Sequence, residues 1–355
     1  MRHQAHIREA VPEDNAELQK VQAQCPMGTT LVVSAVNTPD FFARAKAYAS
    51  CNVFVACDEN RIIGSAACAI REATVKGHLS RVGYEFQYFT LPEYRKKGIA
   101  RQLHRHIEDH LIQRGAFYSY LIIMEGNLPS MRLFASEGFQ LHRNLVMAGL
   151  ATYREMEVPS GGKIRLIASK DLDAVAQLLN DTWQGYDLYE PSSAESLAAF
   201  VNRTPGYSFD NLLILEDQGE ILACLGFWDW RRIMRLVVIQ RSLKIRMIGL
   251  ILRFMRTFRS MPGPIKAGST LKQMMLTPIA FKDPVHLAAL LRTTNNQAVA
   301  SGIEQIFCVL ERDHPLLSCM KGFIRIDTGI DLYVKPLQQK GPMGKNPVFI
   351  DGIDL

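Results

Sequence analysis

Short runs of apolar and β-branched residues alternate with polar turns and with helical patterns along most of the chain. Residues 53–57 and 61–64, for example, read as two strands joined by the polar turn Asp58-Glu59-Asn60. A helix is expected after Gly98, because apolar residues recur there every four positions and would line one face. The apolar positions of that helix are Ile99, Leu103, Ile107 and Leu111. Strands and helices that alternate in this way predict an α/β protein with a mixed sheet.

The same pattern occurs twice along the chain. Residues 7–14 and 164–171 both read as a strand that runs into a helix, and the hairpin at 53–64 has a counterpart at 212–223. Two later landmarks keep the same order in both copies: Thr90-Leu91-Pro92 with Leu276-Thr277-Pro278, and Gly138-Phe139 with Gly322-Phe323. A repeat of this kind indicates two copies of one unit, and the alternative is chance similarity between α/β strands.

The spacing between the copies sets the expected domain boundaries. The early landmarks lie 157 to 159 residues apart and the late ones 184 to 186, so the second copy holds about 27 extra residues between its third and fourth strands. The predicted units are a first domain at 1–157, a linker at 159–162, a second domain at 163–338 with a basic insertion at 231–262, and a C-terminal tail at 339–355.

The composition is that of an ordinary soluble globular protein. Of the 355 residues, 48% are apolar and 21% are charged, which is enough for two packed domains. Apolar runs stay far shorter than the roughly 20 residues of a membrane span, and the first residues lack the apolar stretch of a signal peptide, so a cytoplasmic location is expected. Seven cysteines without a CxxC pair suggest neither a disulfide framework nor a zinc site, and no metal is expected.

The net charge of +6 comes from one segment. Residues 231–272 contain eleven Lys and Arg and no Asp or Glu, whereas the rest of the chain has a net charge of −5. A basic, apolar segment can pack on its own domain or in a homodimer, cover a cleft as a lid, or lie on an anionic membrane surface through residues 231–258. Nucleic-acid binding is not expected, because too few aromatic residues accompany the basic ones.

A basic glycine loop lies between a predicted aromatic strand at 84–89 and the helix that starts after Gly98. The loop reads Arg95-Lys96-Lys97-Gly98-Ile99-Ala100. Free N–H groups at a helix start attract a phosphate group, a glycine allows its close approach, and the basic side chains add positive charge. The alternative is an exposed basic helix start without a ligand.

The order of several motifs resembles the GNAT superfamily of acyl-CoA-dependent N-acetyltransferases. The family pattern Arg/Gln-x-x-Gly-x-Gly/Ala is matched by Arg95, Gly98 and Ala100, and downstream family positions are matched by Asn127 and Gly138-Phe139. The resemblance extends from residue 5 to about residue 150 and implies two acyl-CoA N-acyltransferase folds in tandem. It also implies an enzyme that transfers an acetyl group from acetyl-CoA to a primary amine of a small molecule or peptide.

The resemblance assigns cofactor contacts residue by residue. Residues 95–101 would hold the pyrophosphate of coenzyme A, the main chain of 88–90 would bond its pantetheine arm, and Asn127 would lie near the thioester. Many family members have a Tyr at the position of Phe134 that protonates the leaving thiolate, so solvent, Tyr118 or Ser136 would have to serve here. The residues expected at the cofactor are Tyr88, Phe89, Thr90, Arg95, Lys96, Lys97, Gly98, Ile99, Ala100, Arg101, Asn127 and Phe134.

A base must remove a proton from the attacking amine. Glu85 is the expected catalytic residue, because it lies on the strand that leads into the loop, and partial burial would suit a carboxylate to this role. The alternative is an ordinary strand-edge Glu that faces water or an Arg. His78, before the same strand, and Glu125, after the next one, are weaker candidates.

The second copy has lost the loop. Its sequence there is Phe281-Lys282-Asp283-Pro284-Val285-His286, which has no glycine and has an acid where a diphosphate would approach. This copy is therefore expected to be structural and not to bind coenzyme A. Two other functions stay open for the whole chain: a non-catalytic acyl-CoA-binding or regulatory protein, and a membrane-associated acyltransferase that uses a longer acyl chain.

Overall fold

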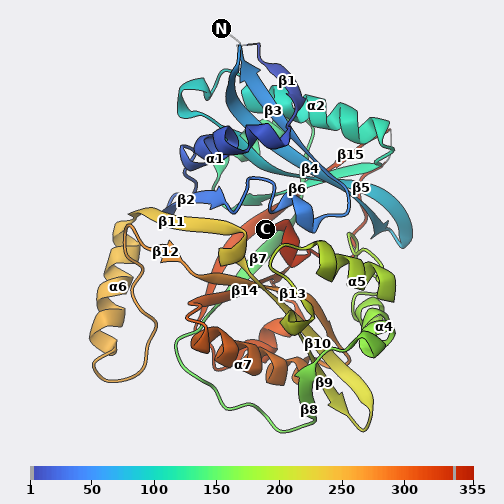
Figure 1. Ribbon diagram of the computed structural model, residues 1–355, viewed down its shortest axis with the longest axis vertical. Helices are drawn as coiled ribbons and strands as arrows, with labels where there is room; N and C mark the ends of the chain where they lie inside the picture. The colour runs from blue at the N-terminus through green and yellow to red at the C-terminus, as the bar shows by residue number, and fades with distance from the viewer. Residues whose placement is uncertain (1–3, 339–340) are drawn as a thin grey trace.

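The computed structural model describes residues 4–338 and 341–355, and Figure 1 shows two α/β halves placed along the long axis of the molecule. The first half contains β1 (His6–Glu9), α1 (Asn15–Ala23), β2 (Leu31–Asn37), β3 (Cys51–Asp58), β4 (Arg61–Val75), β5 (His78–Thr90), α2 (Ile99–Gln113), β6 (Tyr118–Met124), α3 (Leu128–Ser136) and β7 (Gln140–Ala151). The second half contains β8 (Lys163–Leu166), α4 (Leu172–Thr182), α5 (Ala194–Arg203), β9 (Leu212–Asp217), β10 (Glu220–Asp229), β11 (Met234–Arg241), α6 (Leu243–Met255), β12 (Thr270–Leu271), β13 (Gln273–Phe281), α7 (Pro284–Ala300), β14 (Gln305–Glu311) and β15 (Arg325–Pro336). The predicted α/β class is confirmed.

One mixed sheet of twelve strands passes through both halves. Its strand order is β1-β3-β4-β5-β6-β15-β7-β14-β13-β10-β9-β8. The order reads the same from both ends when β1 is matched with β8, β3 with β9, β4 with β10, β5 with β13, β6 with β14 and β15 with β7. Parallel pairing occurs at equivalent places, between β5 and β6 and between β13 and β14, over three residue pairs each. The two halves therefore have the same fold.

The last strand of each half lies beside the other half. β15 pairs with β6 over seven residue pairs, and β7 pairs with β14 over seven. The two exchanged strands also pair with each other over ten residue pairs. Main-chain hydrogen bonds therefore join the halves into one ladder, and a cut near residue 157 would separate strands that belong to the same sheet.

A repeated ion pair explains the first landmark of the sequence repeat. Arg8 contacts both carboxylate oxygens of Asp14, at 2.6 and 2.8 Å, and the N–H of Val11 donates to the same carboxylate. Arg165 and Asp171 form the same pair in the second half, at 2.6 and 3.0 Å. The hydrogen bond from Arg8 holds the pKa of Asp14 below its usual value. In each half this pair fixes the turn between the first strand and the first helix.

The end of the chain lies in the core between the halves. Residues 339–340, where a tail was expected to begin, lie outside the residues that the structure describes. Val348, Ile350 and Ile353 are buried. Asp354 is also buried and forms an ion pair with Arg71 of β4 at 3.0 Å. The segment that the sequence suggested as a tail is therefore part of the packed interior.

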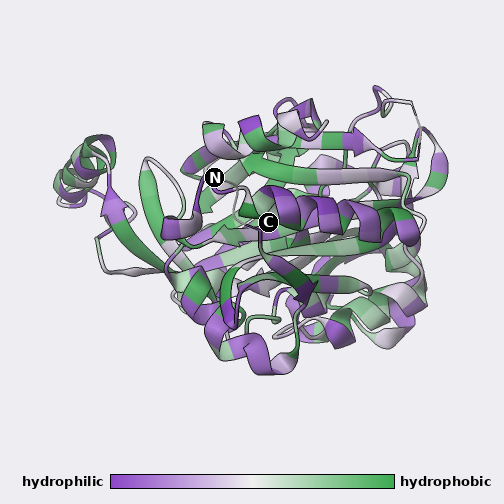
Figure 2. Ribbon diagram, turned by 90° about the horizontal axis from the view of Figure 1, so that it is seen from above, coloured by the Kyte–Doolittle hydropathy of each residue, from purple (hydrophilic) through white to green (hydrophobic). Residues whose placement is uncertain are grey.

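The basic insertion forms a small sheet and a projecting helix. It lies between β10 and β13, the third and fourth strands of the second half. Its first part is β11, which pairs with β2 of the first half along most of its length and with β12 at its other edge. The helix α6 follows β11, and Figures 1 and 2 show it standing away from both halves.

The strand exchange predicts that residues 1–157 do not fold alone. Without the second half, β6 loses its partner β15 and β7 loses both of its neighbours, which leaves long unpaired edges. We expect this fragment to aggregate when expressed alone and to form a soluble complex when co-expressed with residues 158–355, as measured by size-exclusion chromatography. A monomeric 1–157 fragment with a cooperative unfolding transition would contradict the prediction.

Candidate functional site

Two neighbouring strands diverge in the middle of the first half. β5 and β6 are paired only at Val82–Tyr84, opposite Tyr118–Tyr120. Beyond Tyr84, β5 continues along β4 to Thr90, whereas β6 continues along β15 to Met124. The inner edge of β5 after Tyr84 therefore lacks a strand partner, and its main-chain groups there can bond a ligand that lies along the strand.

A β-bulge marks the point of divergence. The register between β4 and β5 shifts between the pairs Ala67 with Phe86 and Ser65 with Phe89. Gln87 lies in this bulge with φ at +54°, a backbone conformation that is rare for a residue other than glycine. The residue is 8% exposed, and neither its amide nitrogen nor its amide oxygen has a hydrogen-bond partner. A buried amide without partners in a strained bulge is typical of a residue that meets a ligand.

The strand leads directly into the start of α2. After Thr90 comes a short 3-10 helix, Pro92–Tyr94, and then the basic loop. Gly98 has φ at +91° and is the N-cap of α2, so the loop turns where only glycine adopts the conformation without strain. The N–H of Gln102 donates to the carbonyl of Gly98 at 3.1 Å, and the N–H groups before it belong to the first turn, which has no acceptor within the helix. A helix start with free N–H groups therefore follows the splayed strand, at the place where the sequence predicts an anion site.

The basic side chains of the loop surround this helix start. Arg95, Lys96 and Lys97 are exposed, and the guanidinium of Arg95 donates to the carbonyl of Thr90 at 3.3 Å. The ammonium of Lys97 lies 4.7 Å from the ring centre of Tyr94. These contacts hold the loop against the end of β5 while leaving positive charge at the helix start.

The other residues expected near the phosphates have different roles. Ile99 is buried in the core, so only its N–H can face a ligand, and Ala100 is half-buried beside it. Arg101 bonds Glu137, and its Nη2 donates to Ser136 at 2.9 Å, so its guanidinium ties α2 to the end of α3. Asn127 is the N-cap of α3, where its side-chain oxygen accepts the N–H of Ser130 at 3.4 Å.

Glu85 points to the opposite side of the sheet from the C-terminal segment and is completely buried beneath α2. Its carboxylate accepts the hydroxyl of Ser119 at 2.6 Å, contacts Nδ1 of His104 at 3.0 Å, and accepts the phenol of Tyr88. The side chains of Glu85 and His104 are both 0% exposed. The expectation of a partly buried Glu85 was therefore wrong about its surroundings: the carboxylate is enclosed and fully partnered. His78 lies exposed at the far end of β5, and Glu125 pairs with Arg312 at the surface.

A row of alternating charges runs outward from Glu85. His104 lies between Glu85 and Glu108, whose carboxylate is 3.3 Å from Nε2, and Lys335 of the exchanged β15 pairs with Glu108 at 2.6 Å. Burial disfavours a charged His104, but hydrogen bonds with Glu108 and Glu85 outweigh it and raise the pKa of His104 to about 9. For Glu108, burial is likewise outweighed, by His104 and Lys335, and its pKa falls to about 2. The row joins β5, α2 and β15.

Phe134 lies on α3 and faces the place where β5 and β6 diverge. It is buried, and its ring packs edge-on against Tyr88 at 5.1 Å, Phe139 at 5.6 Å and His104 at 5.8 Å between ring centres. The two substitutes considered for the missing phenol are placed elsewhere. Tyr118 donates to the carbonyl of Gly341, and the hydroxyl of Ser136 donates to the carbonyl of Leu133.

Tyr88 is a phenol that sequence reasoning did not consider for proton transfer. It lies at the splay, against Phe134, and donates to Glu85. Burial and the neighbouring carboxylate raise the pKa of Tyr88 well above its usual value, so the phenol stays protonated at neutral pH. Gln87 was also missed. A polar residue amid the aromatic run 84–89 was visible in the sequence, but the bulge that buries it was not.

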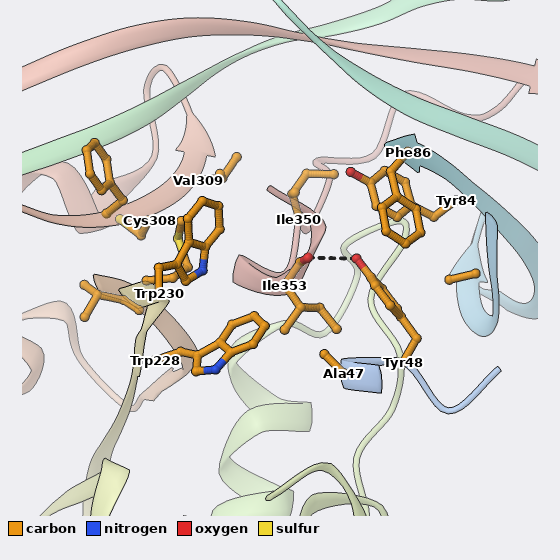
Figure 3. Close-up of a cluster of buried hydrophobic side chains, with 14 of the residues drawn as sticks. Ala47, Tyr48, Tyr84, Phe86, Trp228, Trp230, Cys308, Val309, Ile350 and Ile353 are labelled. Carbon is orange, nitrogen blue, oxygen red and sulfur yellow. Dashed lines mark hydrogen bonds between the residues drawn. The ribbon is translucent and has the colours of Figure 1, made fainter. Parts of the chain in front are cut away.

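The face of β5 opposite α2 is aromatic and is covered by the end of the chain. The rings of Tyr84 and Phe86 stack at 5.1 Å, and Tyr48 packs on Phe86 at 5.2 Å (Figure 3). The hydroxyl of Tyr48 donates to the carbonyl of Ile353 at 2.7 Å, and Tyr84 donates to the carbonyl of Asp354. The buried guanidinium of Arg44 lies 4.7 Å from the Phe86 ring centre. This wall of aromatic and charged groups lies on the side of the sheet away from α2.

The equivalent splay in the second half is filled. β13 and β14 diverge after Met275 and Phe307, and the C-terminal segment enters between them. The hydroxyl of Thr277 donates to Asp351 at 2.6 Å, and Gly352 lies so close to Met275 and Leu276 that a Cβ there would clash. Figure 3 shows Ile350 beside Cys308 and Val309 of β14. A pantetheine arm has no room there.

The second helix start is also occupied by the chain itself. Asp283 is the N-cap of α7, and its carboxylate accepts the N–H of Val285 at 2.8 Å. The Asp283 carboxylate thus occupies the N–H groups that a phosphate would need, in agreement with the expectation that an acid blocks this position. His314 accepts the N–H of Leu316 and contacts the hydroxyl of Tyr186, as expected of a structural histidine.

All seven cysteines are free thiols, and six of them are buried. The thiol of Cys25 donates to the carbonyl of Thr90 at 3.2 Å. Within the ranges 4–338 and 341–355, no three or more His, Cys, Asp and Glu side chains gather in a way that could hold a metal ion.

The raised pKa of His104 predicts that stability depends on pH. An unfolded histidine titrates near pH 6.5, so the folded protein holds this proton more tightly. The resulting stabilisation is complete below about pH 6.5 and is lost as the pH rises through about 9. We expect the free energy of unfolding of the wild type to fall by about 1–3 kcal/mol over this range relative to His104→Gln, measured by urea unfolding.

His142→Gln is the matched control, because burial lowers the pKa of His142. Its contribution to stability rises with pH only up to about pH 6.5 and is constant above it, so His142→Gln should keep the wild-type fall in stability between about pH 6.5 and 9. An identical pH dependence in the wild type and in His104→Gln would mean that the ring is not charged in the folded protein.

Comparison with known proteins agrees with this geometry. Residues 22–139 match the model of the acetyltransferase (GNAT) family. A search of curated proteins gives no significant match. The fold is similar to Saccharomyces cerevisiae N-myristoyltransferase with bound myristoyl-CoA, with a TM-score of 0.66 at 10% identity, covering 100% of this chain and 86% of that one.

Two bacterial structures have the same fold. A GCN5-related N-acetyltransferase from Sphaerobacter thermophilus gives a TM-score of 0.57 at 12% identity and covers 99% of both chains. A probable N-acyltransferase from Enterococcus faecalis gives 0.52 at 10% identity and covers 95% of this chain and 73% of that one. Residues 22–139, which hold the splayed strand and the glycine-capped helix, thus match the acetyltransferase (GNAT) family, and the whole chain has the two-half fold of these N-acyltransferase structures.

Proposed function

We propose that the protein transfers an acyl group from acyl-CoA to a primary amine of a small molecule or peptide, with the first half as the active half. The observation that carries the proposal is that one strand, β5, supplies both parts of an acyl-CoA site. It diverges from β6 after Tyr84, and it leads into the free helix start at Gly98. A thioester on the splayed edge and a pyrophosphate on the helix would thus lie along one continuous path.

Coenzyme A is proposed to lie along β5 with its pyrophosphate on the N–H groups of residues 98–101. Arg95, Lys96 and Lys97 would neutralise the phosphates, and the main chain of 88–90 would bond the pantetheine arm. Asn127, at the start of α3 beyond the end of β6, is proposed to lie near the thioester end. The unpartnered amide of Gln87 would bond the cofactor where the strands part.

Acyl transfer forms a C–N bond and breaks the C–S bond of the thioester. The amine releases a proton to solvent, the departing thiolate takes one from a donor in the site, and the donor is reprotonated from solvent. Holding both reactants in one site supplies much of the rate gain. We assign the proton donor to Tyr88, which is protonated and lies against Phe134, where relatives with a Tyr have their donor. Glu85 is enclosed and is therefore a positioning residue in this proposal. Its carboxylate accepts the hydrogen bond from the Tyr88 hydroxyl and is held in place by His104 and Ser119.

We propose that the acyl group is acetyl, because loop 95–100 matches the pattern of GNAT enzymes, whose acyl donor is acetyl-CoA. A longer chain is the second candidate, because the N-myristoyltransferase structure that is similar over the whole chain has myristoyl-CoA bound. A panel of donors from acetyl-CoA to myristoyl-CoA, compared by kcat/KM, separates the two.

The coenzyme A site is tested with Gly98→Asp. The substitution strains a backbone with φ at +91° and places a carboxylate where the pyrophosphate would bind. We expect isothermal titration calorimetry to show coenzyme A binding that is about 100-fold weaker or undetectable, because the new carboxylate repels the negatively charged pyrophosphate at the helix start. Gly77→Asp is the matched control, since Gly77 has φ at +76° in a distant open turn.

Absence of saturable binding by the wild type would refute the proposed function. Binding without thiol release for any acyl donor and amine would leave a non-catalytic acyl-CoA-binding protein.

The role of Tyr88 is tested with Tyr88→Phe. Loss of the hydroxyl should lower kcat about 10- to 100-fold with little change in the affinity for coenzyme A, as expected for one general acid. Glu85→Gln should lower kcat less, because the amide still accepts the Tyr88 hydroxyl. An unchanged kcat in Tyr88→Phe would exclude Tyr88 as the proton donor.

A further inference from the structure

The helix α6 carries an exposed apolar face. Five apolar side chains recur on one side of the helix, and a sixth, Phe258 in the turn after it, packs its ring against Phe254 at 5.3 Å; each of the six is more than half exposed. They are Leu243, Met247, Leu250, Ile251, Phe254 and Phe258. The other exposed apolar residues away from the insertion, such as Leu79 and Val285, are scattered over the surface. We call the six the α6 face. A contiguous apolar patch of this kind marks a binding surface.

The opposite side of α6 is already in contact with its own insertion. Ile245 and Leu252 are half-buried, and a Cβ on Gly249 would lie 3.2 Å from Pro264 of the returning segment. Arg241, the last residue of β11, donates to the carbonyl of Ile265 at 2.6 Å and ties that segment to the strand that leads into the helix. The orientation of α6 is therefore set by packing, and the α6 face is the side turned away from the protein.

Positive charge flanks the α6 face. Arg246 and Arg253, seven residues apart, lie along one border, and Lys244 lies near the other. The whole stretch 231–272 contains eleven basic and no acidic residues. In the part of the chain that the structure describes, the one ion pair made by this stretch is that of Arg231 with Asp229, at its very start. The cations beside the α6 face are therefore left for an external partner.

We propose that α6 docks the protein on the surface of an anionic lipid bilayer. An apolar stripe bordered by Arg and Lys matches acyl chains beneath negative headgroups. A helix of 13 residues is about 20 Å long, shorter than the roughly 30 Å of a bilayer core, so α6 lies in the plane of the surface. None of the described helices has the length and apolar character needed to cross a membrane.

A second copy of the chain fits the same surface less well. Pairing two α6 faces would bring Arg246 and Arg253 of both copies together without an acidic partner, because the insertion contains no carboxylate. A lipid headgroup supplies the missing negative charge.

Docking would also orient the first half. β11, which leads into α6, pairs with β2 over seven residue pairs, and the N–H of Ser242 donates to the carbonyl of Thr30 at 2.9 Å. The chain before β2 reaches the splay, where Cys25 bonds the carbonyl of Thr90. The bilayer would therefore lie on the side of the molecule formed by α1 and β2.

The test uses the full-length protein and two kinds of vesicle, phosphatidylcholine alone and phosphatidylcholine with about one-third phosphatidylglycerol. We expect sedimentation with the anionic vesicles only, and release at high salt. Arg246→Glu with Arg253→Glu should weaken binding at least about tenfold, because each basic residue near the surface contributes. Leu250→Ser with Phe254→Ser should weaken it similarly, by loss of apolar contact.

Matched controls change the same chemistry elsewhere on the surface. Lys170→Glu with Lys321→Glu reverses two exposed charges, and Leu79→Ser with Val285→Ser removes two exposed apolar side chains. Both double variants should bind like the wild type. Equal losses in the controls, or no sedimentation of the wild type with anionic vesicles, would overturn the proposal. Concentration-dependent dimers that vanish in Leu250→Ser with Phe254→Ser, without vesicle binding, would assign the α6 face to a second copy instead.

Phe254→Trp gives an independent measurement. The three native tryptophans, Trp183, Trp228 and Trp230, are buried, so the new indole reports on the α6 face. We expect a blue-shifted emission with anionic vesicles and no shift with phosphatidylcholine alone. No shift with anionic vesicles would also contradict the proposal.

Discussion

The pairing of β7 with β15 is the constraint on which the rest of the structure depends. These two strands, one from each half, are bonded over ten residue pairs, and each also completes the sheet of the other half. β15 pairs with the edge of β6 that faces away from β5, so β6 keeps one strand partner after β5 has parted from it beyond three residue pairs. The exchange also returns the chain to the centre of the molecule, where the C-terminal segment fills the second splay and covers the aromatic face of β5.

The near-symmetry of the two halves makes their difference informative. In both halves two parallel strands diverge after three residue pairs, which leaves a wedge-shaped gap between them. In both halves the first of these strands leads into the start of a helix. In the second half the C-terminal segment fills the wedge and Asp283 occupies the helix start. In the first half the wedge holds Gln87 with an unpartnered amide, and the helix starts at Gly98. One copy of the fold thus uses the opening for its own packing, and the other leaves polar groups that a ligand can satisfy.

The parts of the site that are contiguous in sequence could be predicted, and the parts that depend on distant segments could not. Loop 95–101 is a local motif, and Gly98 and the apolar stripe of α2 are visible without any tertiary information. The strand exchange depends on pairing between residues almost 200 apart, for which the sequence carries no register signal. Glu85 was recognised as important, but its enclosure was not, because His104 and Ser119 reach it from other elements. The bulge at Gln87 has no local signature either.

The insertion connects the second half to the half that we propose to be active. Its strand β11 does not join the main sheet of its own half and instead extends β2, next to the segment that reaches the splay. The second half has no open wedge of its own, so an insertion there is free to change without disturbing a cofactor site. The proposed docking of the exposed, charged helix α6 would therefore place the first half at a membrane surface. It would do so without any change to loop 95–101, the bulge at Gln87 or Tyr88.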